Sequence, residues 1–93
     1  MLKPFSKYLR TQGKAANTAA AYCRDVSLYL KWCQAAFGEQ PARLYRANVL
    51  EYISFMRNVK GYDPRTVNRH LSSLRCLNDW LVKTGQQAEA AVL

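Results

Sequence analysis

The feature of this sequence that most constrains the fold is the segment 63–83, in which apolar residues repeat at helical spacing. Aliphatic residues recur three or four positions apart, at Val67, Leu71, Leu74, Leu77 and Leu81. In an α-helix this spacing places side chains on one face, so the segment is predicted to form an amphipathic helix with one buried side. Asp63 can cap its first turn and Pro64 suits the first helical position, while Gly85 can end it.

The opposite side of this predicted helix is polar and mainly basic. It carries Arg65, Asn68, Arg69, Ser72, Ser73 and Cys76, with Arg75 beside them. An ordinary solvated face mixes both signs of charge, whereas this one has no carboxylate before Asp79. The partial positive charge at a helix N-terminus adds to the basic character at the same end. We therefore predict that this face meets an anionic partner.

Three further segments are predicted to be helical because each has a stripe of apolar residues. They are residues 2–12, residues 14–37 and about 47–59, joined by Gly13, by a loop at 39–45 and by a turn at 60–62. The residues expected to face inward are Phe5, Tyr8 and Leu9 in the first, Tyr22, Val26, Tyr29, Leu30, Cys33 and Phe37 in the second, and Val49, Leu50, Ile53 and Met56 in the third. Residues 86–93 can form a short final helix or a linker. No stretch has the long alternation of a strand, so the predicted fold class is all-α, a compact bundle of four to five helices.

Composition narrows the class of partner. A chain of 93 residues is long enough for one domain with one hydrophobic core. Fourteen Lys and Arg residues against six Asp and Glu give a formal net charge of +8, which favours nucleic acid or an anionic membrane surface as partner. No apolar run is long enough to span a membrane, and the N-terminus lacks the apolar segment of a signal peptide. We therefore expect a cytoplasmic protein.

Few residues in the chain could support chemistry. Cys23, Cys33 and Cys76 are odd in number and form no C-x-x-C pair, so neither a disulfide framework nor a zinc finger is predicted. His70 is the only histidine, which excludes a cluster of histidine metal ligands and a classical catalytic triad. We expect His70 on the helix surface, the cysteines in structural roles, and no catalytic residue, metal or cofactor.

Two helix patterns, taken together, resemble a known protein family. Residues 17–26 have the form N-T-x-x-x-Y-x-x-D-[LV], which resembles the second helix of the N-terminal core-binding domain of tyrosine recombinases, the phage integrase family. The matching residues are Thr18, Tyr22, Asp25 and Val26. Residues 66–81 are similar to the fourth helix of that domain, T-[IV]-N-R-x-L-S-x-L-R-x-[FL]-x-x-[WY]-L. Smaller matches are Phe5, Tyr8 and Leu9 and the turn Gly13-Lys14, and the resemblance covers residues 2–85.

The resemblance implies a fold and a role. In that family the domain is a small SAM-like helical bundle, one half of a clamp around duplex DNA, with its second and fourth helices facing the major groove. A catalytic domain follows it in the chain. By this resemblance residues 1–85 are a core-binding domain, and residues 86–93 are a short tail or linker toward a catalytic domain that this chain lacks. The implied partners are duplex DNA, the catalytic domain of the same protein and other recombinase protomers, and the chain alone is not expected to cut DNA.

The polar face and the resemblance together give a set of expected DNA-binding residues: Lys14, Asn17, Thr18, Arg65, Thr66, Asn68, Arg69, Ser72 and Ser73. Two departures from the family pattern accompany them. Ala15 stands where the family usually has a Ser or Thr helix cap, and no Asn-Pro follows the fourth helix.

Other functions stay open at this point. SAM-like bundles also act as protein–protein interaction modules, which should expose an apolar patch. Charge alone also permits RNA or a membrane surface as the partner.

Overall fold

The computed structural model describes residues 2–41 and 43–86. This part of the chain contains four helices and no strand: α1 (Leu2–Thr11), α2 (Ala16–Phe37), α3 (Arg46–Asn58) and α4 (Pro64–Lys83). The predicted all-α class is confirmed, with four helices in the described residues. The prediction of a short helix or linker at 86–93 falls almost entirely outside them.

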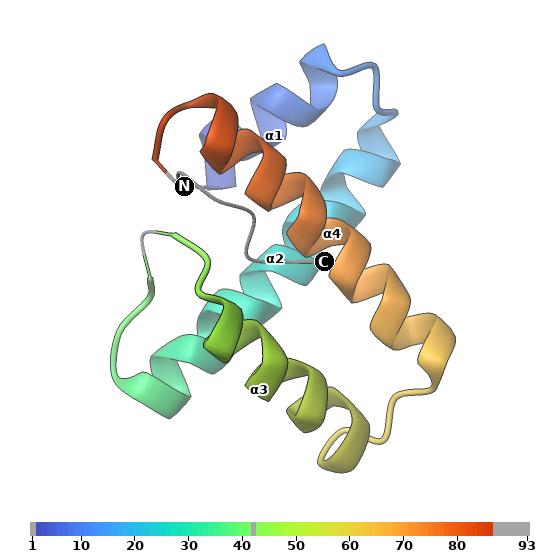
Figure 1. Cartoon of the computed structure of the whole chain (residues 1–93). Coiled ribbons are helices and arrows are strands. Elements are labelled where there is room, and N and C mark those ends of the chain that lie inside the picture. The colour runs from blue at the N-terminus through green and yellow to red at the C-terminus, as the bar shows by residue number, and fades with distance from the viewer. Residues whose placement is uncertain (1, 42, 87–93) are drawn as a thin grey trace.

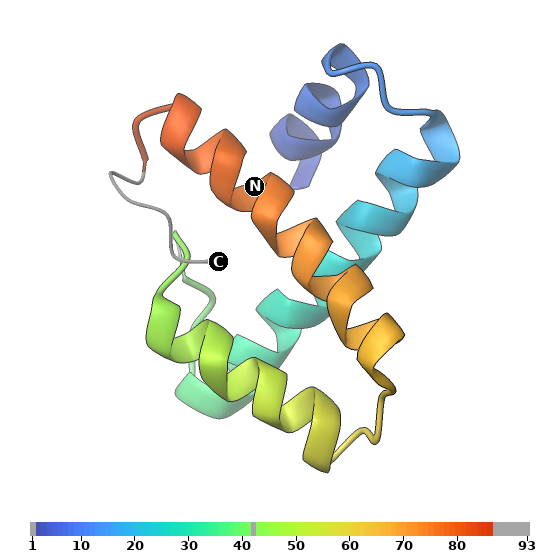
Figure 2. The same cartoon turned by 45° about the vertical axis from the view of Figure 1, so that its right-hand side comes forward.

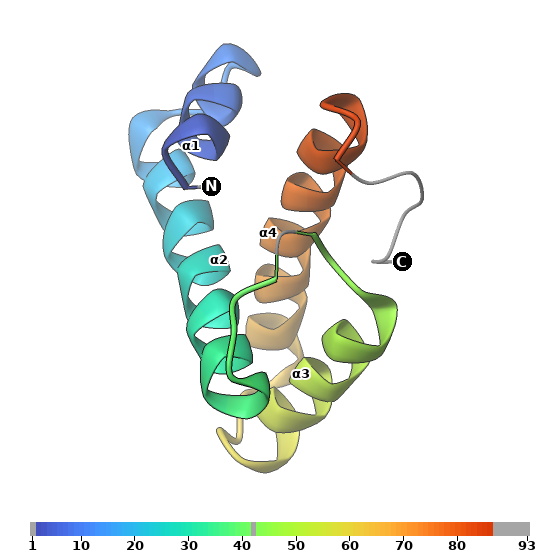
Figure 3. The same cartoon turned by 90° about the vertical axis from the view of Figure 1, so that its left-hand side faces the viewer.

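The helices form two layers around one core. α1 lies with α2 in one layer, and α3 lies with α4 in the other (Figure 3). α2 and α4 cross near their middles at the centre of the molecule (Figure 1), and the packing between these two helices is the most extensive in the bundle. Among the described helices, none combines the length and the hydropathy needed to cross a membrane.

α4 begins as the sequence predicts. Asp63 is the N-cap residue, and its Oδ1 accepts a hydrogen bond from the Thr66 amide at 2.8 Å. Pro64 occupies the first helical position, where a missing N–H group leaves no hydrogen bond unmade. Thr84 caps the other end, and Gly85 follows with a φ of 76°, a left-handed conformation that glycine adopts without strain. The predicted start and end of this helix are therefore confirmed.

The α4 stripe forms the centre of the core. All five of its predicted aliphatic residues are buried, from Val67 to Leu81. Trp80 widens the stripe, and its ring centroid lies 5.9 Å from that of Phe5 in α1. The core residues contributed by the other helices are Phe5, Leu9, Ala19, Val26, Tyr29, Leu30, Cys33, Val49, Tyr52 and Met56. A single stripe on α4 thus meets all three of the other helices.

Two inward-facing assignments were wrong. Leu50 is 54% exposed, because Val49, Tyr52 and Met56 form the buried face of α3 and Leu50 is turned away from it. Tyr52 is buried in its stead, and its ring lies edge-on to the Tyr29 ring at a centroid distance of 5.1 Å. Phe37 is 45% exposed at the last position of α2 and contacts only the outer edge of the core, where its ring meets Trp32.

The start of α2 lacks a side-chain cap, as its sequence predicts. Ala15 is the N-cap residue with extended backbone angles, and no side chain there accepts a hydrogen bond. Asn17 Oδ1 accepts from the neighbouring Thr18 amide at 3.0 Å, inside the helix. The helix begins at Ala16, before Asn17, so Asn17 does not act as an N-cap residue in place of Ala15.

Candidate nucleic-acid interface

The first turns of α2 and α4 lie on the same side of the molecule. Both are at the right of Figure 1, and both come forward when the molecule is turned in Figure 2. This arrangement follows from the crossing of the two helices near their middles, which leaves their first halves to diverge on one side. The predicted DNA-binding residues other than Lys14 belong to these two halves, so the fold brings them to one side. Lys14 lies just before α2 and lines a hollow with Cys76 and Asp79 from the second half of α4.

Most of the predicted residues reach solvent. Asn17, Arg65, Asn68 and Arg69 are exposed, and Lys14, Thr18, Thr66 and Ser72 are partly exposed. Some of their polar atoms have local partners. Ser72 Oγ donates to the Asn68 carbonyl at 3.0 Å, and the Lys14 ammonium lies 5.6 Å from the centre of the Tyr22 ring. The side chains of Arg65 and Asn68 have no such bond among the residues that the structure describes, and are open to a ligand.

Ser73 does not belong to this surface, which corrects the sequence-based set. Its side chain is completely buried, and its Oγ donates to Asp25 Oδ2 in α2 at 2.8 Å. Successive residues of an α-helix are turned by about 100°, so Ser73 faces α2 while Ser72 faces outward. A buried hydroxyl that already donates to a carboxylate cannot contact DNA.

Asp25 lies at the centre of this region and was not among the site residues predicted from the sequence. Its side chain is 1% exposed and receives a hydrogen bond from Arg69 Nη2 at 3.2 Å as well as the one from Ser73. Burying a carboxylate is costly unless it is paired and hydrogen-bonded, and here both conditions hold. A signal was present in the sequence, because Asp25 lies at helical spacing within the apolar stripe of Tyr22 and Tyr29.

His70 is buried as well, against the expectation that it lies on the surface. Its Nε2 lies 3.0 Å from Arg69 Nη2, which donates to it, and its ring stacks on Tyr62 at a centroid distance of 5.4 Å. Burial lowers the pKa of His70; the Asp25 carboxylate opposes this shift, and the Arg69 charge adds to it. The imidazole is therefore neutral near pH 7 and accepts at Nε2. We define Asp25, Arg69, His70 and Ser73 as the crossing network.

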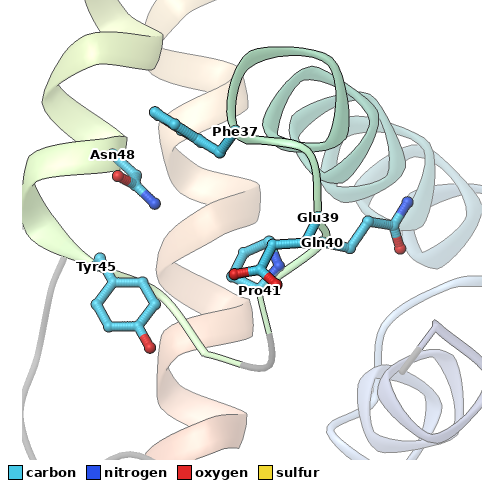
Figure 4. A pocket seen from close by; sticks show the side chains of 6 residues that line it. All are labelled: Phe37, Glu39, Gln40, Pro41, Tyr45 and Asn48. Carbon is cyan, nitrogen blue, oxygen red and sulfur yellow. The ribbon is translucent and has the colours of Figure 1, made fainter.

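The surface formed by the described residues has several hollows. One of about 310 Å³ lies between the end of α2 and the start of α3, lined by Phe37, Glu39, Gln40, Pro41, Tyr45 and Asn48 (Figure 4). No group of three or more His, Cys, Asp or Glu side chains in the described ranges could hold a metal ion. Burial raises the pKa of the Cys33 and Cys76 thiols, so neither is activated as a nucleophile.

Comparison with known proteins agrees with this architecture. A family model described as the phage integrase N-terminal SAM-like domain matches residues 1–88. The chain therefore belongs to this family of domains. It is 36% identical over 91 residues to a "TnP I resolvase" of Bacillus thuringiensis, covering 98% of this chain and 32% of that protein.

Two further relatives are named as tyrosine recombinases. The identity is 30% over 88 residues to tyrosine recombinase XerC of Xanthomonas campestris, covering 94% of this chain and 27% of the relative. It is 29% over 90 residues to tyrosine recombinase XerD of Listeria monocytogenes, covering 95% of this chain and 30% of the relative. The chain thus spans about a third of the length of these curated relatives. No solved structure matches it significantly.

Proposed function

We propose that this chain is the DNA-binding core-binding domain of a site-specific tyrosine recombinase or integrase. It holds duplex DNA with the first halves of α2 and α4. The observation that carries the proposal is the gathering of exposed basic and amide side chains from these two helix starts on one side of a domain of this family. Of the acids in this region, Asp25 is buried and paired, and Asp63, exposed at the start of α4, accepts from the Thr66 amide.

The physical basis of binding is contact with phosphates. Lys14, Arg65 and Arg69 supply positive charge, and binding of such side chains to DNA releases condensed counterions. The start of α2 has no N-cap side chain, so it presents amide donors and partial positive charge toward anions, whereas the Thr66 amide of α4 already donates to Asp63. An α-helix also fits a major groove about 12 Å wide, so the polar side chains of α4 can reach base edges as well. Asn68 is the residue of this face best suited to base contact, because an amide can pair with adenine through two hydrogen bonds.

The proposed role in the whole protein is to place DNA before a separate catalytic domain. The relatives are about three times as long as this chain, and their names describe recombinases and a resolvase. We infer that the full-length protein is a tyrosine recombinase whose reaction residues lie outside these 93 residues. The catalytic domain and other protomers on the same DNA are then its protein partners.

A duplex titration at two salt concentrations tests the proposal. We expect weak binding whose affinity falls steeply as salt rises, with no covalent adduct. Arg65→Ala should lower the slope of log K against log salt by ~1, as loss of one phosphate contact does. Lys31→Ala, in the second half of α2, removes the same charge and should change affinity far less. Binding that does not respond to salt, or equal losses for both variants, would contradict the docking face.

A protein-interaction role is the second candidate. The described residues expose several large apolar side chains, among them Phe37 and Tyr45 at the hollow in Figure 4. Sedimentation of the free chain distinguishes the two roles. A self-associating module would form dimers that Phe37→Ser disrupts, whereas a DNA-binding domain would stay monomeric until duplex is added.

A further inference from the structure

We propose that Asp25 is a positioning residue for DNA binding. It holds the Arg69 guanidinium so that this side chain contacts the phosphate backbone and does not read bases. The inference rests on the proposed function, since it says how one residue of the DNA-binding face is used. It assigns to a buried carboxylate, which DNA never touches, a measurable effect on DNA affinity.

The Arg69 guanidinium is tied inward through one nitrogen. Nη2 donates to Asp25 Oδ1 at 3.2 Å and to His70 Nε2 at 3.0 Å. A guanidinium Nη atom carries two N–H groups, so both donors of Nη2 are used within the protein. Nε and Nη1 have no partner among the residues that the structure describes, and the side chain of Arg69 is 52% exposed. The outward half of the guanidinium is therefore available to a ligand.

This geometry removes the paired donors that base recognition needs. A guanidinium offers two parallel N–H groups either through Nε with Nη2 or through Nη1 with Nη2, and bidentate contact with guanine requires such a pair. Nη2 belongs to both pairs and is occupied. The donors that remain on Nε and Nη1 point from different edges, so they suit single hydrogen bonds to phosphate oxygens. Such contacts position a protein on DNA without reading its sequence.

The crossing network also orients Arg69 relative to α2. Asp25 belongs to α2 and Arg69 to α4, and Ser73 fixes the second carboxylate oxygen of Asp25 at 2.8 Å. A carboxylate held on both oxygens is a rigid anchor, and a charge-assisted bond to it is stronger than one to a neutral amide. The guanidinium is thus ordered before DNA arrives, which reduces the entropy lost on binding.

Charge and positioning predict opposite outcomes for Asp25→Asn. This variant keeps the size of the side chain and removes a negative charge next to Arg69. Charge alone predicts tighter binding to DNA, because the net positive charge of the domain rises. Positioning predicts weaker binding, because the amide holds the guanidinium less firmly. Glu51→Gln is the matched control, since it removes an exposed acid of α3 with the same change in net charge.

The experiment measures the affinity of each variant for two duplexes of unrelated sequence by fluorescence anisotropy at two salt concentrations. We expect Arg69→Ala to weaken binding to both duplexes by the same factor, on the order of fivefold, and to lower the salt slope by ~1. Asp25→Asn should weaken binding to both, while Glu51→Gln should leave it unchanged or slightly tighter. In Arg69→Ala, adding Asp25→Asn should cause little further loss, because Asp25 acts through Arg69.

Arg69→Lys gives an independent test that leaves Asp25 in place. It keeps the positive charge, but one ammonium cannot both pair with Asp25 and extend beyond it to a phosphate. We expect it to lose nearly as much affinity as Arg69→Ala. Thermal melts confirm that each variant is folded, and if Asp25→Asn does not fold, Arg69→Lys decides the question.

The possible failures are distinguishable. Asp25→Asn or Arg69→Lys binding at least as tightly as the unmodified chain would overturn the positioning role and leave the proposed function standing. Additive losses in the double variant would show that Asp25 acts only through stability of the fold, and would also overturn it. A loss in Arg69→Ala confined to one duplex would overturn the assignment to phosphate. Failure of the unmodified chain to bind any duplex would remove the proposed function itself.

Discussion

His70 connects three parts of the molecule through one ring. The ring stacks on Tyr62 in the turn before α4, its Nε2 accepts from Arg69, and its Nδ1 lies 3.8 Å from Asp25 Oδ1. Because burial lowers the pKa of His70, the folded protein keeps the imidazole neutral over a pH range in which a free histidine is charged. This makes pH a direct probe of the crossing network.

We expect the free energy of unfolding to decrease as pH falls from about 7 to about 5. The histidine of the unfolded chain has a pKa of about 6.5, and the folded value is lower, so below pH 6.5 the unfolded state binds a proton that the folded state does not. The contribution of His70 to the free energy of unfolding is complete above the pKa of the unfolded chain. It is lost progressively as pH falls from that value through the lower pKa of the folded state. Urea melts at several pH values measure the effect, and His70→Gln should abolish it. Constant or rising stability on acidification would show that the imidazole is not held neutral.

Sequence periodicity correctly predicted which residues form the middle of the α4 stripe, but not which residues beside it are buried. The aliphatic residues repeat clearly, and all are buried. Ser73 and His70 flank the same stripe, and whether a flanking residue is buried depends on the helix that covers it. Burial of a polar residue there depends on a buried acid in α2 that is distant in sequence. No local pattern in residues 63–83 contains that information.

At the scale of helices, the missing cap of α2 is a local weakness that sequence alone revealed. Ala15 has the extended backbone angles of an N-cap residue but no side-chain acceptor. We predict that Ala15→Ser stabilises the domain by about 0.5–1 kcal/mol, toward the lower end of the usual range because Asn17 already takes the Thr18 amide. Thermal or urea melts measure the change. Ala20→Ser, at an exposed position within α2, is the control and should give no gain.

For α3, the sequence predicted the bounds of the helix but not which of its faces is buried. The expected bounds of about 47–59 agree closely with Arg46–Asn58, because turn residues mark both ends. The inward face was misjudged because Leu50 and Tyr52 both fit an apolar stripe. Aromatic packing across helices decides between them: Tyr52 contacts Tyr29 and Trp32, each at a centroid distance of 5.1 Å. That choice depends on rings from α2, which the sequence of α3 does not show.

At the scale of the whole molecule, one core serves all four helices, so damage at its centre should affect the entire domain. Leu74 is 1% exposed in the middle of the α4 stripe. We predict that Leu74→Ala costs ~2–5 kcal/mol of unfolding free energy, a large part of the ~5–15 kcal/mol that holds a small domain together. Leu50→Ala, the same change at an exposed site, should cost less than about 0.5 kcal/mol. Equal costs in denaturant melts would mean that the stripe is not the centre of the core.

The crossing network has a consequence for the alignment of α2 against α4. The core residues of α2 include Val26 and Leu30, and apolar contacts are non-directional, so they specify the alignment less sharply than a hydrogen bond does. The Asp25 carboxylate meets Arg69 and Ser73, which are 44 and 48 positions away in sequence, in only one alignment. Any other alignment would leave a carboxylate buried without a partner, which is strongly unfavourable. The polar contact thereby favours one alignment of α2 against α4, and with it one spacing between the two helix starts that face the proposed DNA.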